Sequence, residues 1–104
     1  MQMRSASSRE HPVDPDMDRE LHVLIVEDSE DDAHLIIREV QRGGYRVAFE
    51  RVETKEQMQA ALGHQAWDFI LSDYTMPRFS AMAALDTLKV SGLDIPFIVI
   101  SGTI

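Results

Sequence analysis

The sequence predicts an α/β protein built on a doubly wound parallel sheet, and three observations support this class. Short apolar runs alternate with longer segments whose apolar residues recur at helical spacing. Three of the four runs are continuous, as in strands that are covered on both faces. Strand–helix alternation of this kind specifies parallel strands joined by right-handed crossovers. We therefore expect four strands and three helices in residues 20–104.

The first strand is the apolar run 21–26, which stops at the acids Glu27 and Asp28. Ser29 follows as a helix N-cap, because its side chain can accept a hydrogen bond from the third residue of the helix. Helical spacing predicts a buried face made of Ala33, Ile36, Ile37 and Val40. The pair Gly43–Gly44 then ends this helix.

The second strand covers residues 45–50, where apolar and polar residues alternate. This period of two suits an edge strand better than a central one. Thr54 can cap a second helix, which we expect to end at Gly63. Its predicted apolar stripe consists of Met58, Ala61 and Leu62.

The third strand is the run 69–71, which is buried on both faces and ends near Asp73, since Pro77 cannot continue a ladder. The third helix is predicted over residues 80–90, with Gly92 as its stop. Its predicted buried residues are Met82, Leu85 and Leu88. The fourth strand is the run 96–100, ending on Ser101.

Composition narrows the class of protein. At 104 residues the chain allows one domain. A net charge of −8 argues against direct contact with nucleic acid, which needs a basic face. The absence of cysteine excludes disulfides and thiolate metal sites. No stretch approaches the roughly 18 apolar residues of a membrane span. We expect no membrane association and a cytoplasmic location.

Residues 1–19 are polar and rich in serine and proline, without an apolar period. This composition predicts a disordered leader or linker. The folded domain is therefore expected to occupy residues 20–104.

Three strands end in polar groups, at Glu27 and Asp28, at Asp73 and at Ser101. Parallel strands bring their carboxyl ends to one edge of a sheet, so adjacent first and third strands would crowd three carboxylates together. Such carboxylates repel one another unless a cation neutralises them. Oxygen-only ligands favour a hard ion, and Mg²⁺ is the expected cofactor. The alternative is three solvated loop acids, and their placement at strand ends favours the metal site over it.

The motifs together resemble response-regulator receiver domains, the phosphoacceptor modules of two-component signalling. The resemblance rests on Val26-Glu27-Asp28, on Asp73 followed by Thr75-Met76-Pro77, and on Ile100-Ser101-Gly102. Each motif is weak alone, but three in the right order after apolar strands are specific. The resemblance implies a flavodoxin-like receiver fold and a phosphoprotein acting in a phosphorelay. It also implies a sensor histidine kinase or a phosphotransfer protein as partner.

The resemblance also implies a role for each site residue. Asp73 matches the phosphoacceptor, and Asp28 matches the main Mg²⁺ ligand, with Glu27 beside it. Thr75 would contribute its backbone carbonyl to the metal. Ser101 matches the hydroxyl that binds the phosphoryl group after transfer.

Two features depart from the family pattern. Ala81 stands where the family usually has glycine. The family also carries a lysine after a fifth strand, which we expect to be absent from this chain, since Lys89 lies in the third helix and cannot replace it. Only four strands and three helices of the receiver fold are expected, without the last helix, strand and helix. This leaves open whether the sequence is truncated or is that of a reduced receiver.

Two functions from different classes follow. The first is a receiver that takes phosphate from a kinase phosphohistidine onto Asp73 with Mg²⁺; the alternative is a pseudo-receiver that binds proteins without phosphoryl turnover. Neither is an enzyme. A dehalogenase-type phosphatase is disfavoured because that family needs an acid at the position that Thr75 occupies here.

We also expect self-association through the uncharged strand edge at residues 95–100.

Overall fold

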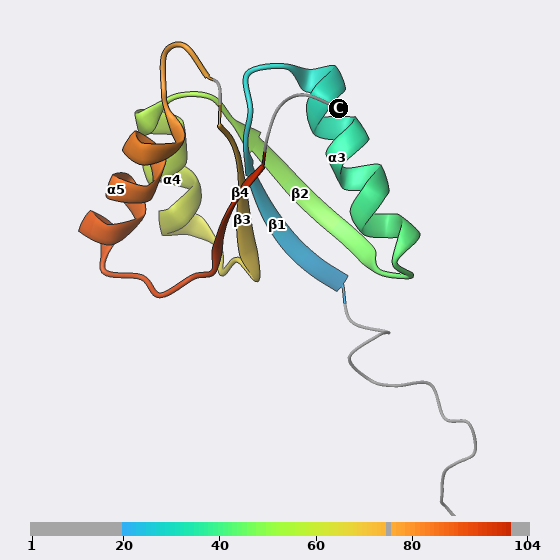
Figure 1. The fold of residues 1–104 in the computed structure, drawn as a ribbon. Helices are drawn as coiled ribbons and strands as arrows, with labels where there is room; N and C mark the ends of the chain where they lie inside the picture. Colours follow the sequence, from blue (N-terminus) through green and yellow to red (C-terminus); the bar gives the residue numbers. More distant parts are fainter. Residues whose placement is uncertain (1–19, 75, 101–104) are drawn as a thin grey trace, which may run out of the picture.

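The fold is a four-stranded parallel sheet with helices on both faces, as predicted (Figure 1). The computed structural model describes residues 20–74 and 76–100, so the predicted leader lies outside the described residues. The sheet order is β2-β1-β3-β4. The strands are β1 (Glu20–Val26), β2 (Arg46–Val52), β3 (Phe69–Asp73) and β4 (Phe97–Ile100). The helices are α3 (Glu30–Arg42), α4 (Lys55–His64) and α5 (Ala81–Ser91).

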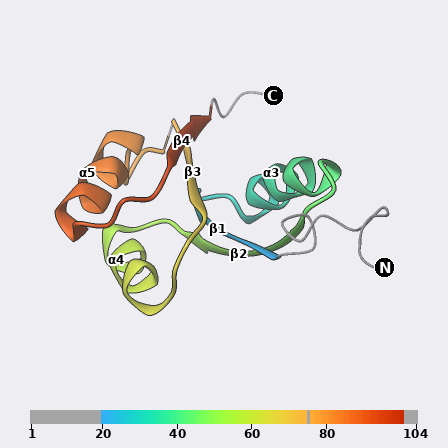
Figure 2. The ribbon, with the colours of Figure 1, turned by 90° about the horizontal axis from the view of Figure 1, so that it is seen from below.

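Two apolar layers cover the sheet, with α3 on one face and α4 and α5 on the other (Figure 2). Successive side chains of a strand point to opposite faces, so a continuous apolar run supplies both layers. In β1, Val23 and Ile25 belong to the α3 layer, and Leu24 and Val26 belong to the opposite layer. All four are fully buried, which makes β1 the centre of the core.

Each helix begins at a hydroxyl N-cap. Ser29 accepts a hydrogen bond from the backbone N–H of Asp32 at 3.2 Å, and Thr54 accepts one from Gln57 at 3.1 Å. Ser80 caps α5 in the same way. These caps satisfy amide groups that the helix leaves unpaired. They also place the start of α3 and α4 directly after the carboxyl ends of β1 and β2.

Two of the three predicted helix ends are confirmed. Gly43 caps α3, and Gly92 caps α5 in the left-handed conformation, with φ 79°. The prediction for α4 was wrong, because that helix continues through Gly63 to His64 and is capped by Gln65. Glycine favours a helix end only where a left-handed residue closes the last turn, and the Gln65 backbone is extended instead.

The predicted buried face of α5 was partly wrong. Met82 is 71% exposed, whereas Ala81, Ala84 and Leu88 are buried. Spacings of three and four residues place these three on one face, and Met82 lies one position further round the helix. Leu85 is half-buried at the border of that face.

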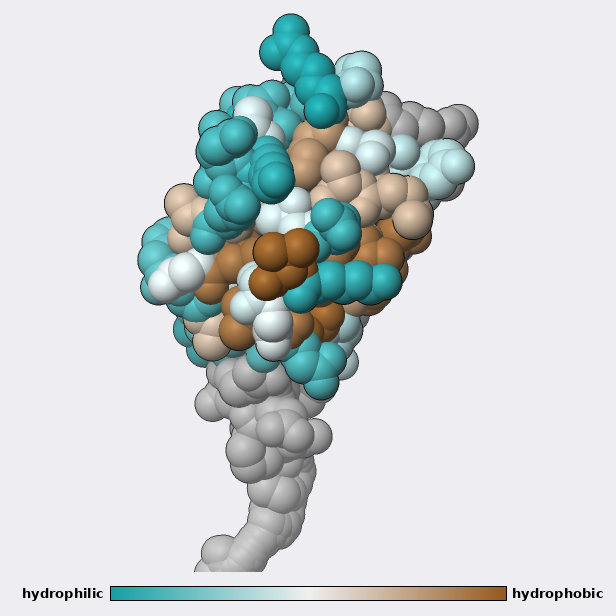
Figure 3. All heavy atoms as spheres, turned by 90° about the vertical axis from the view of Figure 1, so that its left-hand side faces the viewer, coloured by the Kyte–Doolittle hydropathy of each residue, from teal (hydrophilic) through white to brown (hydrophobic). Residues whose placement is uncertain are grey.

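The surface over α4 and α5 is partly apolar (Figure 3). A groove of about 320 Å³ lies there, and its lining includes Leu62, Val90 and Leu93. The strand β4 forms one edge of the described sheet, with Ile98 45% and Val99 48% exposed, while β2 forms the other edge as predicted. No helix in the described part of the chain has the length and apolar character needed to span a bilayer.

The two faces of α5 predict different changes in stability when a side chain is shortened to alanine. Leu88→Ala should lower the free energy of unfolding by about 3 kcal/mol, because it opens a cavity in the core. Met82→Ala should change that free energy by less than about 0.5 kcal/mol, because the side chain is solvated. Urea denaturation of both variants tests the assignment, and equal losses would show that the buried face is misassigned.

Candidate functional site

Three acidic side chains meet at the carboxyl edge of the sheet. Glu27 and Asp28 follow β1, Asp73 ends β3, and β1 and β3 are neighbours with Val26 opposite Ser72. One carboxylate oxygen from each acid lies within 4.8 Å of the other two. The sequence-based expectation that these three acids share a crevice is therefore confirmed.

The backbone on both sides of the crevice is fixed by sheet hydrogen bonds. The N–H of Glu27 donates to the carbonyl of Val52 at 3.0 Å. The N–H of Tyr74 donates to the carbonyl of Ile100 at 2.9 Å. The ladders thus extend one residue past β1 and one past β3. The carboxylate of Asp73 is consequently carried by backbone that is paired rather than by a free loop.

The acids differ in their contact with solvent. Glu27 is 2% and Asp73 is 6% exposed, whereas Asp28 lies open to solvent. Burial is the main reason that the pKa of Glu27 rises from 4.5 to about 7. A hydrogen bond from the N–H of Ser29, at 3.0 Å, opposes this rise. Hydrogen bonds with the other two carboxyl groups and the negative charge of Asp73 raise the pKa further.

The donor set fits a hard divalent cation. All three ligand groups are carboxylates, and a compact set of a few carboxylates is the usual protein contribution to a Mg²⁺ site. A cavity of about 250 Å³ adjoins the crevice, and its lining includes Asp28, Glu53 and Arg78. The cavity leaves room beside the acids for water or for a phosphoryl group.

The segment after Asp73 is held by two buried side chains. Met76 and Phe79 are both 5% exposed and pack in the layer under α4 and α5. Ala81, which replaces the usual glycine, begins α5 and is buried. The predicted site residues Thr75 and Ser101 lie outside the described residues, so their roles stay predictions.

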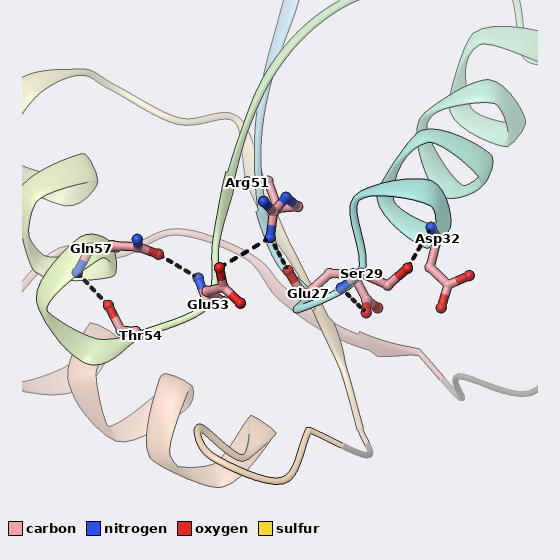
Figure 4. A network of polar contacts seen from close by, with 7 residues as sticks. All are labelled: Glu27, Ser29, Asp32, Arg51, Glu53, Thr54 and Gln57. Atoms are coloured by element: carbon pink, nitrogen blue, oxygen red, sulfur yellow. Dashed lines mark hydrogen bonds and ion pairs between the residues drawn. The ribbon is translucent and has the colours of Figure 1, made fainter.

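Sequence reasoning missed Arg51, whose side chain reaches the edge of the site from β2 (Figure 4). Its Nη1 donates to the backbone carbonyl of Glu27 at 3.2 Å and lies 3.6 Å from a carboxylate oxygen of Glu53. The sequence did contain an indication of this contact, because Arg51 is a basic residue near the carboxyl end of a neighbouring strand. Its partner depends on the register of β1 and β2, which pairs Ile25 with Arg51.

The family model for the response regulator receiver domain matches residues 23–104. This is more than half of the chain, and the matched region includes the whole acid crevice. The chain therefore belongs to the response-regulator receiver family of two-component signalling, as its motifs and its fold indicated. Comparison with curated proteins gives no match.

The raised pKa of Glu27 predicts a pH dependence of stability in the metal-free chain. Below pH 4.5 the group is protonated in both the folded and unfolded states. Between pH 4.5 and about 7 the unfolded chain releases this proton while the folded chain keeps it, so this group lowers stability as pH rises through that window. Thermal melts with chelator should show that Glu27→Gln removes this decline and melts higher than wild type at pH 7.

The exposed acid Glu56 supplies a matched control, because Glu56→Gln removes the same charge from the first turn of α4. Its melting temperature should follow pH as in the wild-type chain. A Glu27→Gln variant whose profile also follows that of wild type would contradict the burial argument.

Proposed function

We propose that this receiver domain accepts a phosphoryl group on Asp73 from a phosphohistidine of a sensor histidine kinase or a phosphotransfer protein. The observation that carries the proposal is the set of three carboxylates within 4.8 Å at the strand ends of a receiver-family chain. The domain acts as a switch that is modified and reset, so we propose no enzyme activity for it. A cytoplasmic location fits this role.

In the proposed step a carboxylate oxygen of Asp73 attacks phosphorus. The bond between phosphorus and the imidazole nitrogen breaks, and its electron pair returns to the ring, which takes a proton from solvent. The product is an acyl phosphate on Asp73 and a neutral histidine on the donor. The paired backbone on either side of Asp73 orients the attacking oxygen, which is most of what phosphoryl transfer requires.

The chain's residues supply the electrostatics of the step. Glu27, Asp28 and Asp73 would hold Mg²⁺, which cancels the repulsion between the carboxylate and the phosphoryl oxygens. We propose that Thr75 adds its backbone carbonyl to the ion. The hydroxyl of Ser101 would donate to a phosphoryl oxygen after transfer, where charge accumulates.

Incubation with acetyl phosphate and Mg²⁺, followed by intact-mass analysis, tests the proposal. We expect one phosphate adduct that hydroxylamine removes, because an acyl phosphate is a mixed anhydride whose acyl carbon hydroxylamine attacks. Asp73→Asn should abolish the adduct, while Asp86→Asn on the exposed side of α5 should retain it. An adduct that survives Asp73→Asn would refute the assignment, and a wild-type chain that binds Mg²⁺ without forming an adduct would favour the pseudo-receiver.

We also propose self-association at the β4 edge, whose side chains Ile98 and Val99 are about half exposed and carry no charge. Light scattering of the 104-residue chain should give a mass above that of a monomer. Ile98→Lys should lower this mass, because a charge on an edge strand opposes pairing. Leu35→Lys, at an equally exposed position on α3, should not lower it. A wild-type monomer would contradict the proposal.

A further inference from the structure

We propose that Arg51 is a positioning residue that ties the acid site to the first turn of α4. The inference rests on the proposed function, because the ligand whose binding it affects is Mg²⁺. Arg51 lies near the end of β2, between the strand that carries Glu27 and the helix that follows β2. From there its side chain contacts the backbone carbonyl of Glu27 and the side chain of Glu53, which precedes α4 (Figure 4).

On the site side, Arg51 holds the peptide that precedes Asp28. Its guanidinium donates to the Glu27 carbonyl at 3.2 Å, and the carboxylate of the same Glu27 accepts from the N–H of Ser29 at 3.0 Å. One residue is thus held at both its main chain and its side chain. The side chain of Arg51 is only 27% exposed, which reduces the competition of water for these contacts.

On the helix side, the contacts continue into the cap of α4. Glu53 lies 3.6 Å from the guanidinium of Arg51, and its own N–H donates to the side chain of Gln57 at 2.8 Å. The N–H of Gln57 in turn donates to the hydroxyl of Thr54, the N-cap. A continuous series of polar contacts therefore runs from the acid site to the start of α4.

Two roles for Arg51 predict opposite effects on Mg²⁺ affinity. If the guanidinium acted only as a nearby positive charge, it would repel the ion, and its removal would strengthen binding. If it positions the Glu27 main chain, its removal lets the ligands move and weakens binding. Residues that support ligands from outside the coordination shell typically contribute tenfold or more to metal affinity. The half-buried position of Arg51 and its two simultaneous contacts favour the positioning role.

A titration of the full chain with Mg²⁺, followed by backbone amide chemical shifts, tests the proposal. In the wild-type chain we expect the amide signals of Asp28, Glu53 and Gln57 to shift together. Arg51→Met should weaken Mg²⁺ binding about tenfold. It should also remove the shifts at Glu53 and Gln57 while leaving a shift at Asp28.

Two further variants keep the test decisive. Arg51→Lys retains the charge but loses the planar guanidinium whose Nη1 contacts both partners, so its Mg²⁺ affinity should also fall. Arg42→Met removes the same charge from an exposed ion pair with Glu39 in the last turn of α3, and it should bind Mg²⁺ as wild type does.

The outcomes separate this inference from the proposed function. Unchanged or stronger Mg²⁺ binding by Arg51→Met would overturn the positioning role, as would a fall in melting temperature with unaltered affinity. A wild-type chain that binds no Mg²⁺ would refute the metal site and this inference together. The positioning role would be supported if the wild-type chain binds Mg²⁺ and Arg51→Met loses both Mg²⁺ affinity and the shifts at Glu53 and Gln57.

Discussion

The close approach of three carboxylates at one edge of the sheet is the constraint on which the rest of the structure depends. Two of them, Glu27 and Asp73, are almost fully buried, so hydration cannot compensate for their mutual repulsion. Burial is the main cause that raises the pKa of Glu27 to about 7, and the repulsion from Asp73 adds to this conflict between buried charges. A proton or a divalent cation relieves it, which makes the site responsive to binding and to charge.

Such an arrangement requires a rigid support, and the parallel sheet provides it. The central strands β1 and β3 are covered on both faces by apolar layers, and the sheet ladders continue past the ends of both strands. Met76 and Phe79 hold the following loop in the same core. Apolar burial stabilises by about 25 cal/mol per Å². The two layers therefore stabilise the sheet that carries the acids.

The surroundings of the site are polar and connected, in contrast with the layers beneath it. Arg51 links the carbonyl of Glu27 to Glu53, and the helix caps Ser29 and Thr54 stand at the two ends of this series. The acid crevice and the first turns of α3 and α4 thus share one network. In a signalling domain, such connections offer a route by which the charge state of the site can affect the first turns of these helices.

The sequence by itself determined the strand–helix order, the caps Ser29 and Thr54 and the acid set, because apolar periodicity and strand ends are local properties of the chain. It did not determine which face of α5 is buried or where α4 ends. Met82 fits the helical period as a core residue, but the cap at Ser80 and packing against the sheet turn it to solvent. The contact between Arg51 and Glu27 depends on the register of β1 against β2, which joins residues far apart in sequence. Only the tertiary structure fixes that register.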